Sequence, residues 1–289
     1  MKNPILQLKE QITKLTDSQR RVADYIIKNP VDVAFLTVDQ LAGLVGTSTT
    51  TIMRLTYNIG YSGYSEFQKG LQELLRTTSD PNTRLEVNLK NKEGVDLWIQ
   101  SAENQINNIN STMSMISKES LEKVLELILQ AQNIHCTAIR SAIPVAQSLS
   151  YGLSRLIGKG TLINADLGEW TEKVIDFTSD DLVIAISFPR YGNKVIEFIR
   201  AAKAQNAKII AITDSYSSPL VNYSDIVLNC NVSSLAFHNS ILAPMFLVDY
   251  LITAVASNDI DLTKARFEKI DSLLTGMKYH HLETFPTKR

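Results

Sequence analysis

The sequence of 289 residues predicts an α/β protein: an all-α bundle at the N-terminus is joined to an α/β domain with a mainly parallel sheet flanked by helices. Two observations predict this division. Helix start signals recur through the first 76 residues, whereas short apolar runs alternate with helical patterns from about residue 131. A polar stretch at residues 77–93 separates the two parts and is the predicted linker.

The first domain, residues 1–76, is predicted to consist of short helices. Thr16–Gln19 and Thr37–Gln40 each match the capping-box spacing, with a hydroxyl at the N-cap and a glutamine three residues later. The first of these helices should stop at Asn29–Pro30. A third helix starts in the hydroxyl run at 47–49 and ends at Gly60. A fourth carries an apolar stripe at helical spacing: Phe67, Leu71, Leu74 and Leu75.

The second domain, residues 94–289, is predicted from alternating strands and helices. Apolar, partly β-branched runs predict strands at 134–139, 161–163, 182–187, 208–213 and 226–228. Helical patterns occur at 95–116, 118–130, 144–156, 193–205 and 237–256. Strand, helix and strand at this spacing favour right-handed βαβ units and therefore a parallel sheet.

Charge and composition exclude several classes of protein. Lys and Arg total 29 against 30 for Asp and Glu, so a polybasic protein that coats nucleic acid or membranes is not expected. The longest apolar run, Ile241–Val255, contains a proline and an aspartate and is too short to span a bilayer. Cys136 and Cys230 stand alone in apolar stretches, which favours a reducing compartment. We therefore expect a cytoplasmic protein without membrane contact.

The segment from Leu41 to Ser48 has the pattern of a helix-turn-helix. Two short helices meet at a glycine-containing turn, and the second begins with a run of hydroxyl residues. Such a second helix presents its N-terminal residues to base edges in the major groove of DNA. Ser48 would cap this helix, Thr49 and Thr50 would be exposed, and Arg54 would reach guanine or a phosphate. The pattern alone leaves open a plain three-helix bundle with a threonine-rich turn.

A family resemblance favours the first interpretation. Gly46–Arg54 (GTSTTTIMR), followed by Ile59–Phe67 (IGYSGYSEF), closely resembles the N-terminal domain of the RpiR (MurR/RpiR) bacterial transcriptional regulators. The resemblance covers most of residues 1–76 and implies binding of double-stranded operator DNA. It implies DNA contacts from six residues: Ser48, Thr49, Thr50, Thr51, Arg54 and Tyr57. Because Tyr57 and Asn58 stand where the family often has basic residues, we expect weaker salt dependence.

Polar residues follow the predicted strands of the second domain. The first strand ends in Arg140-Ser141, a later one leads into Ser187 and then Arg190-Tyr191, and the next ends at Thr213. Ligands bind outside the carboxyl ends of strands in open parallel sheets, and arginine's planar fork suits phosphate or carboxylate. These residues therefore predict an anion site. The alternative is that the two arginines are rim charges paired with acidic residues: Asp166, Glu169 or Asp214.

Residues 125–258 resemble the SIS (sugar isomerase) domain that follows the helix-turn-helix in RpiR regulators. The resemblance lies in Ala211–Ser215, Ser218–Leu220 and Ser224-Asp225, and it implies that Ser141 and Ser187 bind a sugar phosphate. The loops depart from the family pattern. The glycine-rich first turn is Thr137–Ser141 (TAIRS) here, and the S-x-S-G-x-T loop reads Ser187–Gly192 (SFPRYG). Either the arginines compensate, or the ligand is another small anion such as a carboxylate.

The sequence thus predicts a transcriptional regulator whose SIS-type domain senses a small anionic metabolite, with a phosphorylated sugar favoured, and forms a homodimer that could pair into a tetramer. No cofactor, metal site or catalytic residue is expected. The alternative is a sugar-phosphate isomerase. Such an enzyme needs a carboxylate base beside the sugar, often soon after the phosphate loop, where this chain offers Lys194 and, a full helical turn later, Glu197.

Overall fold

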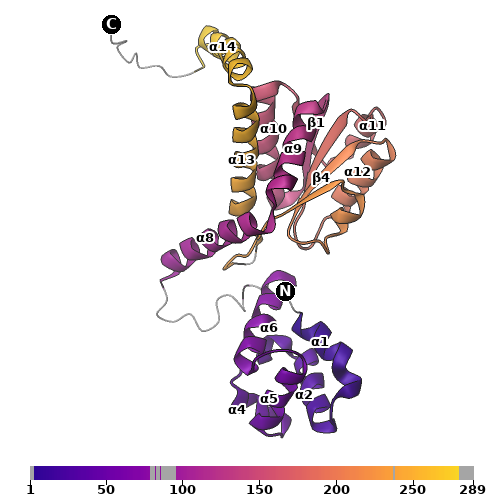
Figure 1. Ribbon diagram of the computed structural model, residues 1–289, viewed down its shortest axis with the longest axis vertical. Coiled ribbons are helices and arrows are strands. Elements are labelled where there is room, and N and C mark those ends of the chain that lie inside the picture. The colour runs from indigo at the N-terminus through magenta and orange to yellow at the C-terminus, as the bar shows by residue number, and fades with distance from the viewer. Residues whose placement is uncertain (1–2, 79–81, 83–84, 86–95, 237, 280–289) are drawn as a thin grey trace. The chain divides into compact units, whose positions relative to one another are not determined.

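The computed structural model describes residues 3–78, 82, 85, 96–236 and 238–279. The chain divides into two compact units, Met1–Asn104 with Ser233–His238 and Gln105–Val232 with Asn239–Arg289 (Figure 1). They are called the N-terminal and C-terminal units below. Most of the predicted linker at 77–93 lies outside the described residues. Its first two residues, Thr77 and Thr78, continue a helix.

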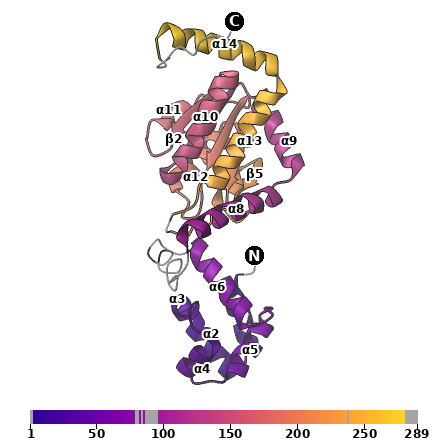
Figure 2. The ribbon, with the colours of Figure 1, turned by 90° about the vertical axis from the view of Figure 1, so that its left-hand side faces the viewer.

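The N-terminal unit contains a bundle of short helices (Figure 2). They are α1 (Pro4–Gln11), α2 (Asp17–Lys28), α3 (Pro30–Val33), α4 (Val38–Val45), α5 (Thr49–Asn58) and α6 (Tyr64–Thr78), with a 3-10 turn at Ile12–Lys14. The four helices predicted here are confirmed as α2, α4, α5 and α6. The stop expected at Asn29–Pro30 ends α2, but α3 starts there at once because proline fits the first position of a helix.

Both predicted capping boxes are present. The Thr16 hydroxyl accepts a hydrogen bond from the Gln19 amide at 3.4 Å, and the Gln19 side chain accepts one from the Thr16 amide at 3.2 Å. Thr37 and Gln40 form the same pair at 3.2 and 2.8 Å. Each box satisfies two backbone groups that the start of a helix leaves without partners, which explains why α2 and α4 begin where they do.

The C-terminal unit is built on a sheet that is parallel throughout the described residues. Its strand order is β2-β1-β3-β4-β5. The strands are β1 (Asn133–Ala138), β2 (Gly160–Asn164), β3 (Asp181–Ile186), β4 (Lys208–Thr213) and β5 (Ile226–Asn229). Because β1 has β2 on one side and β3 on the other, the strand order reverses between β1 and β3. This reversal is the topological switch point at which open α/β sheets bind ligands.

Helices cover both faces of this sheet (Figure 1). One face packs on α9 (Lys118–Gln130), α10 (Ile143–Ile157) and α13 (Leu242–Asn258). The other packs on α11 (Trp170–Val174) and α12 (Asn193–Ala204). The chain also forms α8 (Leu97–Met115) and α14 (Ile260–Gly276). The predicted α/β fold with a parallel, helix-flanked sheet is confirmed.

The long apolar helix starts later than predicted. We expected it from residue 237, but α13 begins at Leu242, two residues before Pro244. Proline is compatible with the first turn of a helix only, so Pro244 prevents an earlier start. The preceding segment is fixed by hydrogen bonds instead: the Asn231 amide donates to Thr112 at 2.9 Å and the Ser240 hydroxyl to Gln105 at 2.6 Å.

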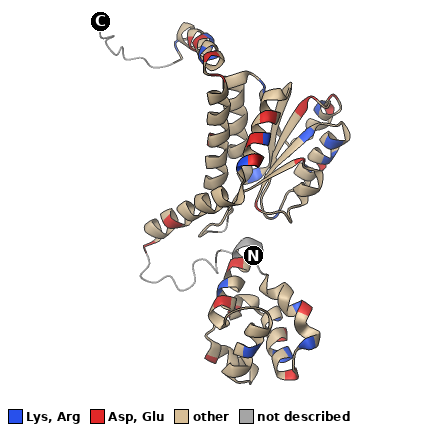
Figure 3. Ribbon diagram, viewed as in Figure 1, with Lys and Arg blue, Asp and Glu red and all other residues tan. Residues whose placement is uncertain are grey.

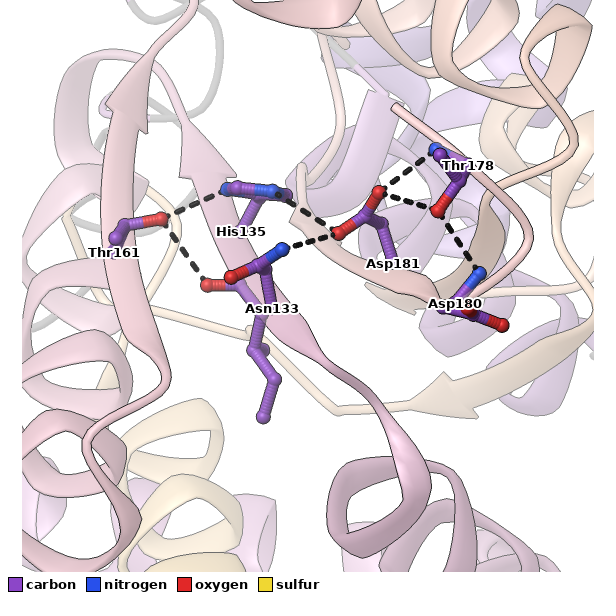
Figure 4. A network of polar contacts seen from close by, with 7 residues as sticks. Asn133, His135, Thr161, Thr178, Asp180 and Asp181 are labelled. Carbon is purple, nitrogen blue, oxygen red and sulfur yellow. Dashed lines mark hydrogen bonds and ion pairs between the residues drawn. The ribbon is translucent and has the colours of Figure 1, made fainter. Parts of the chain in front are cut away.

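A polar network joins the amino ends of β1, β2 and β3 (Figure 4). The Asp181 carboxylate accepts hydrogen bonds from the Asn133 side chain at 2.8 Å and from the Thr178 amide at 2.7 Å. His135 stacks on Phe177 with ring centroids 4.3 Å apart, and its Nδ1 lies 2.8 Å from the Thr161 hydroxyl. Burial lowers the pKa of His135, although Asp181 nearby opposes this shift. We call these residues the amino-edge network.

Candidate functional site

The turn between α4 and α5 has the geometry of a helix-turn-helix. Gly46 ends α4 with φ 65°, a left-handed conformation that favours glycine. The Thr47 amide then donates to the Ala42 carbonyl at 3.0 Å, which closes the end of α4. Two residues after the glycine, Ser48 caps α5: its Oγ accepts from the Thr51 amide at 3.2 Å. The turn is therefore short and fixed by hydrogen bonds at both ends.

The exposed face of α5 carries the predicted DNA-contacting residues. Thr50, Arg54 and Tyr57 follow helical spacing and are exposed, whereas Thr49 and Thr51 are half-buried. Arg54 has no hydrogen bond or ion pair with any described residue. The opposite face of this helix packs into the bundle: Ile52, Leu55 and Thr56 are buried.

Ser48 and Thr51 have a structural task at the start of this helix. Their hydroxyl groups lie 2.9 Å apart, and Ser48 already caps the Thr51 amide. Charged residues of both signs are scattered over the bundle (Figure 3). The exposed face of α5 therefore offers threonine hydroxyl and methyl groups, one arginine and one aromatic ring.

The Gly60–Phe67 motif holds α6 against the bundle. Gly60 has φ 87°, and the buried Tyr61 ring packs edge-on against Phe67 with centroids 5.5 Å apart. The Glu66 carboxylate accepts a hydrogen bond from the Ser62 amide at 2.6 Å. The Tyr64 hydroxyl donates to the Leu36 carbonyl at 2.9 Å, just before α4. Through these contacts, the motif stabilises the packing of α6 next to the helix-turn-helix.

The loops after β1 and β3 meet at the switch point of the sheet. A side chain on Gly192, at the start of α12, would collide with the Ile139 side chain, so the two loops are in direct contact there. Asn239 adds a third segment, since its side-chain amide donates to the Pro189 carbonyl at 3.1 Å. We call this region the carboxyl edge, defined by Ile139–Ser141, Ser187–Gly192, Thr213 and Asn239.

Arg140 and Arg190 are both exposed at the carboxyl edge. Neither forms a hydrogen bond or ion pair with any residue that the structure describes. Two of the acids considered as partners are engaged elsewhere. Asp214 accepts from the Tyr191 hydroxyl at 2.8 Å, and the Lys194 ammonium lies 3.8 Å from Asp166.

The remaining predicted ligand residues differ in exposure. Ser141 is exposed and Tyr191 is half-buried, while Ser187 and Thr213 are buried. The Thr213 hydroxyl lies 2.8 Å from both the Ser187 carbonyl and the Ser218 hydroxyl, so it ties the neighbouring loops together. Burial, followed by the bond to Asp214, raises the pKa of Tyr191 to about 12, so its hydroxyl keeps its proton.

The sequence analysis did not identify three polar groups near this edge. Asn239 lies 50 residues from Pro189, whose carbonyl it binds, and no local sequence pattern predicts such a contact. Thr137 Oγ1 and Asn229 Oδ1 are buried without a hydrogen-bond partner in the described part of the chain. Both lie on the α12-covered face of the sheet, near the ends of β1 and β5. Unsatisfied buried polar atoms are rare in folded proteins.

The described residues hold neither of two other kinds of site. No group of three or more His, Cys, Asp or Glu side chains is placed to hold a metal ion there. Among the same residues, no helix has the length and apolar character needed to cross a membrane.

Comparison with known proteins gives two family matches. Residues 2–78 match the helix-turn-helix domain of the rpiR family, and residues 127–254 match the SIS domain. A relative from Bacillus subtilis (strain 168), the uncharacterized HTH-type transcriptional regulator YbbH, is 23% identical over 271 residues. That alignment covers 92% of this chain and 94% of YbbH.

Two solved structures have similar folds. The sugar isomerase domain of an RpiR transcription factor from Sphaerobacter thermophilus gives a TM-score of 0.59 at 24% identity, over 61% of this chain and 98% of that one. The NanR protein of Vibrio vulnificus, complexed with ManNAc-6P, gives a TM-score of 0.57 at 23% identity, over 95% of this chain and 99% of that one.

The helix-turn-helix and the SIS-type sheet together define a DNA-binding transcriptional regulator. Within that class, the chain has the domain architecture of the RpiR family, as its sequence motifs predicted.

Proposed function

We propose that this regulator binds operator DNA through the exposed face of α5 and responds to a small anionic metabolite, a phosphorylated sugar, at the carboxyl edge. The observation that carries the proposal is the pair of exposed arginines, Arg140 and Arg190, which have no partner among the described residues and lie in touching loops at the switch point of the sheet. The ManNAc-6P complex of the similarly folded NanR protein supports a phosphorylated sugar as the ligand.

On the DNA side, we assign base-edge contacts to Thr49, Thr50 and Arg54. Tyr57 would lie against the sugar–phosphate backbone, and Ser48 and Thr51 would fix the start of the helix. A homodimer would place two such helices in successive major grooves, about 34 Å apart. We place this activity in the cytoplasm, where operator DNA is found.

We propose a coupling mechanism based on linkage. A metabolite that binds one dimer arrangement better than another shifts the population toward it, and thereby changes the spacing of the two α5 helices. Allosteric couplings of this kind are typically about 1–3 kcal/mol, or roughly 5–150-fold in operator affinity.

A regulator without isomerase activity accounts best for these residues. The carboxylates Asp166 and Asp214 are engaged by Lys194 and Tyr191, and Glu197 lies on α12 beyond its first turn. A proton-abstracting base must reach the sugar carbon that it deprotonates. The names of the relatives favour the same conclusion, since they are transcriptional regulators.

Fluorescence anisotropy with DNA from the flanking intergenic regions tests the DNA-binding part. We expect saturable binding to one fragment, weakened about 5–150-fold by Arg54→Ala, since a specific base contact contributes roughly 1–3 kcal/mol. Arg21→Ala is the matched control, because it removes the same exposed charge from α2. Equal weakening by both substitutions, or binding to every fragment alike, would reject α5 as the specific DNA-contacting helix.

A further inference from the structure

The backbone of the carboxyl edge has an unusual feature. Among the described residues other than glycine, four have positive φ: Arg140 (53°), Arg190 (68°), Asn206 (66°) and Lys278 (50°). Asn206 and Lys278 directly follow the ends of α12 and α14, where left-handed residues are common. Arg140 and Arg190 instead lie in the two loops that meet at the switch point.

Glycine adopts this conformation without steric cost, whereas a residue with a Cβ atom is destabilised in it. An arginine at each of these positions therefore costs stability that glycine would not. The arginine side chains must therefore have a role that glycine could not fill. Neither guanidinium has a partner among the described residues, so folding alone does not account for them. Strained residues that serve no contact in the folded chain are typical of ligand-binding sites.

The loop at Ser187–Gly192 lacks one of the backbone amide donors that usually bind an anion. Pro189, next to Arg190, has no amide hydrogen to donate. The helices that start at this edge, α10 and α12, have no side-chain cap, and their positive dipole ends add to the charge of the arginines. In α10 the Ile143 amide already donates to the Arg140 carbonyl, and Pro144 has no amide hydrogen. By contrast, Ser48 and Ser117 cap α5 and α9. The carboxyl edge therefore combines two arginine charges and two helix dipole ends with a carboxylate, that of Asp214, which is bound by Tyr191.

We propose that the carboxyl edge selects a small dianion, whose acidic oxygens are bound in fork geometry by the guanidinium groups of Arg140 and Arg190. Two guanidinium charges are balanced by a dianion and only half balanced by a monocarboxylate, and each planar fork binds a pair of acidic oxygens. A phosphate monoester and a dicarboxylate share the required chemistry. The inference rests on the proposed ligand-sensing function. In this site the arginine side chains, and not backbone amides, would bind the anion.

Thermal unfolding of the full-length protein tests the inference without DNA. Inorganic phosphate and succinate are titrated at constant ionic strength, with acetate and chloride as monoanion references. Because a ligand of the folded state raises Tm, we expect a saturable increase with at least one dianion and none with the monoanions. Glucose 6-phosphate in a further titration distinguishes a phosphate ester from a dicarboxylate as the better ligand.

Two substitutions separate the side chain from the backbone strain. Arg140→Gly and Arg190→Gly remove the guanidinium and relieve the left-handed conformation. We expect an unchanged or higher Tm without ligand and loss of the dianion-dependent increase. Asn206→Gly is the matched control, because it relieves the same conformation in the same unit and should keep that increase. Arg200→Ala controls for the loss of an exposed positive charge and should also keep it.

Arg190→Lys keeps the charge and removes the planar fork, and it serves as the test if a glycine variant does not fold. We expect this variant to bind the dianion at least tenfold more weakly. Full retention of the Tm increase in both glycine variants would overturn the inference, as would a wild type that responds to no dianion. If operator affinity still responded to a metabolite in either case, the proposed function would stand and only the arginine assignment would fail.

Discussion

The two edges of the same sheet treat their charged residues in opposite ways. At the amino edge, Asp181 is buried and accepts hydrogen bonds from Asn133 and Thr178 (Figure 4). At the carboxyl edge, Arg140 and Arg190 are exposed on left-handed backbone without a partner in the described chain. The charged group of the amino edge is used within the fold, whereas the two arginines of the carboxyl edge are available to a ligand. The contrast predicts opposite results of mutation.

Asp181→Ala should have the largest effect on stability. It removes the acceptor of three hydrogen bonds, which come from the Asn133 side chain and from the Thr178 amide and hydroxyl. Asn133 and Thr178 are exposed, so water can replace part of what their donors lose. Because hydrogen bonds to a charged group contribute about 1.5–3 kcal/mol, we expect a loss of roughly 1.5–3 kcal/mol in the free energy of unfolding, measured by urea denaturation. Asp181→Asn keeps one acceptor oxygen and should lose less. A loss below about 1 kcal/mol for the alanine variant would show that the amino-edge network is not structural.

Tyr191→Phe should have an intermediate effect, although Tyr191 belongs to the carboxyl edge. It removes the bond to Asp214 and leaves the half-buried ring in place. A hydrogen bond to a charged group contributes about 1.5–3 kcal/mol, and we expect about 1 kcal/mol here because the site is partly open to solvent. Urea denaturation measures the difference. An unchanged midpoint would mean that water replaces the tyrosine hydroxyl at no cost.

Acidification should weaken the amino edge through His135. Burial lowers the pKa of this histidine in the folded protein, so the unfolded chain takes up its proton first, near pH 6.5. The stability that the neutral histidine contributes is therefore complete above about pH 6.5 and is lost as the pH falls further. Urea denaturation between pH 8 and 5 should show this slope, and His135→Gln should flatten it. An identical slope in the variant would assign the pH dependence to other groups.

Arg140→Ala and Arg190→Ala should have the smallest effect on the unliganded protein. Both side chains are exposed and have no partner in the part of the chain that the structure describes, so a change within about 0.5 kcal/mol of wild type is expected in the same urea measurements. Asp181→Ala, tested side by side, provides the comparison between the edges. A large loss of stability in either arginine variant would show that the carboxyl edge also has a structural task.

Local signals in the sequence predicted much of this fold. Capping boxes at Thr16 and Thr37 and alternating apolar runs fixed the positions of α2, α4 and the strands, because each signal acts within a few residues. The sequence analysis missed α1, α3, α11 and α14 and placed the start of α13 too early. No residue of α14 is buried, so it lacks the apolar stripe that a core imposes on a helix.

The candidate ligand site was predictable only in part. Its arginines and hydroxyl residues follow the strands directly, so the rule for parallel sheets placed them at one edge. Their conformation was not predictable, because positive φ is expected at glycine and both positions hold arginine. Nor was the contact of Asn239 with Pro189, since it depends on how distant loops pack.

The most direct test of the account is operator affinity with and without a phosphorylated sugar that binds the protein. It should be measured for wild type and for the Arg140→Ala/Arg190→Ala double variant. We expect the sugar to change the wild-type Kd by roughly 5–150-fold, as allosteric couplings of about 1–3 kcal/mol do. The double variant should bind operator with the wild-type Kd, and the sugar should not change that Kd. An equal response in both proteins would contradict the assignment of the carboxyl edge as the sensing site.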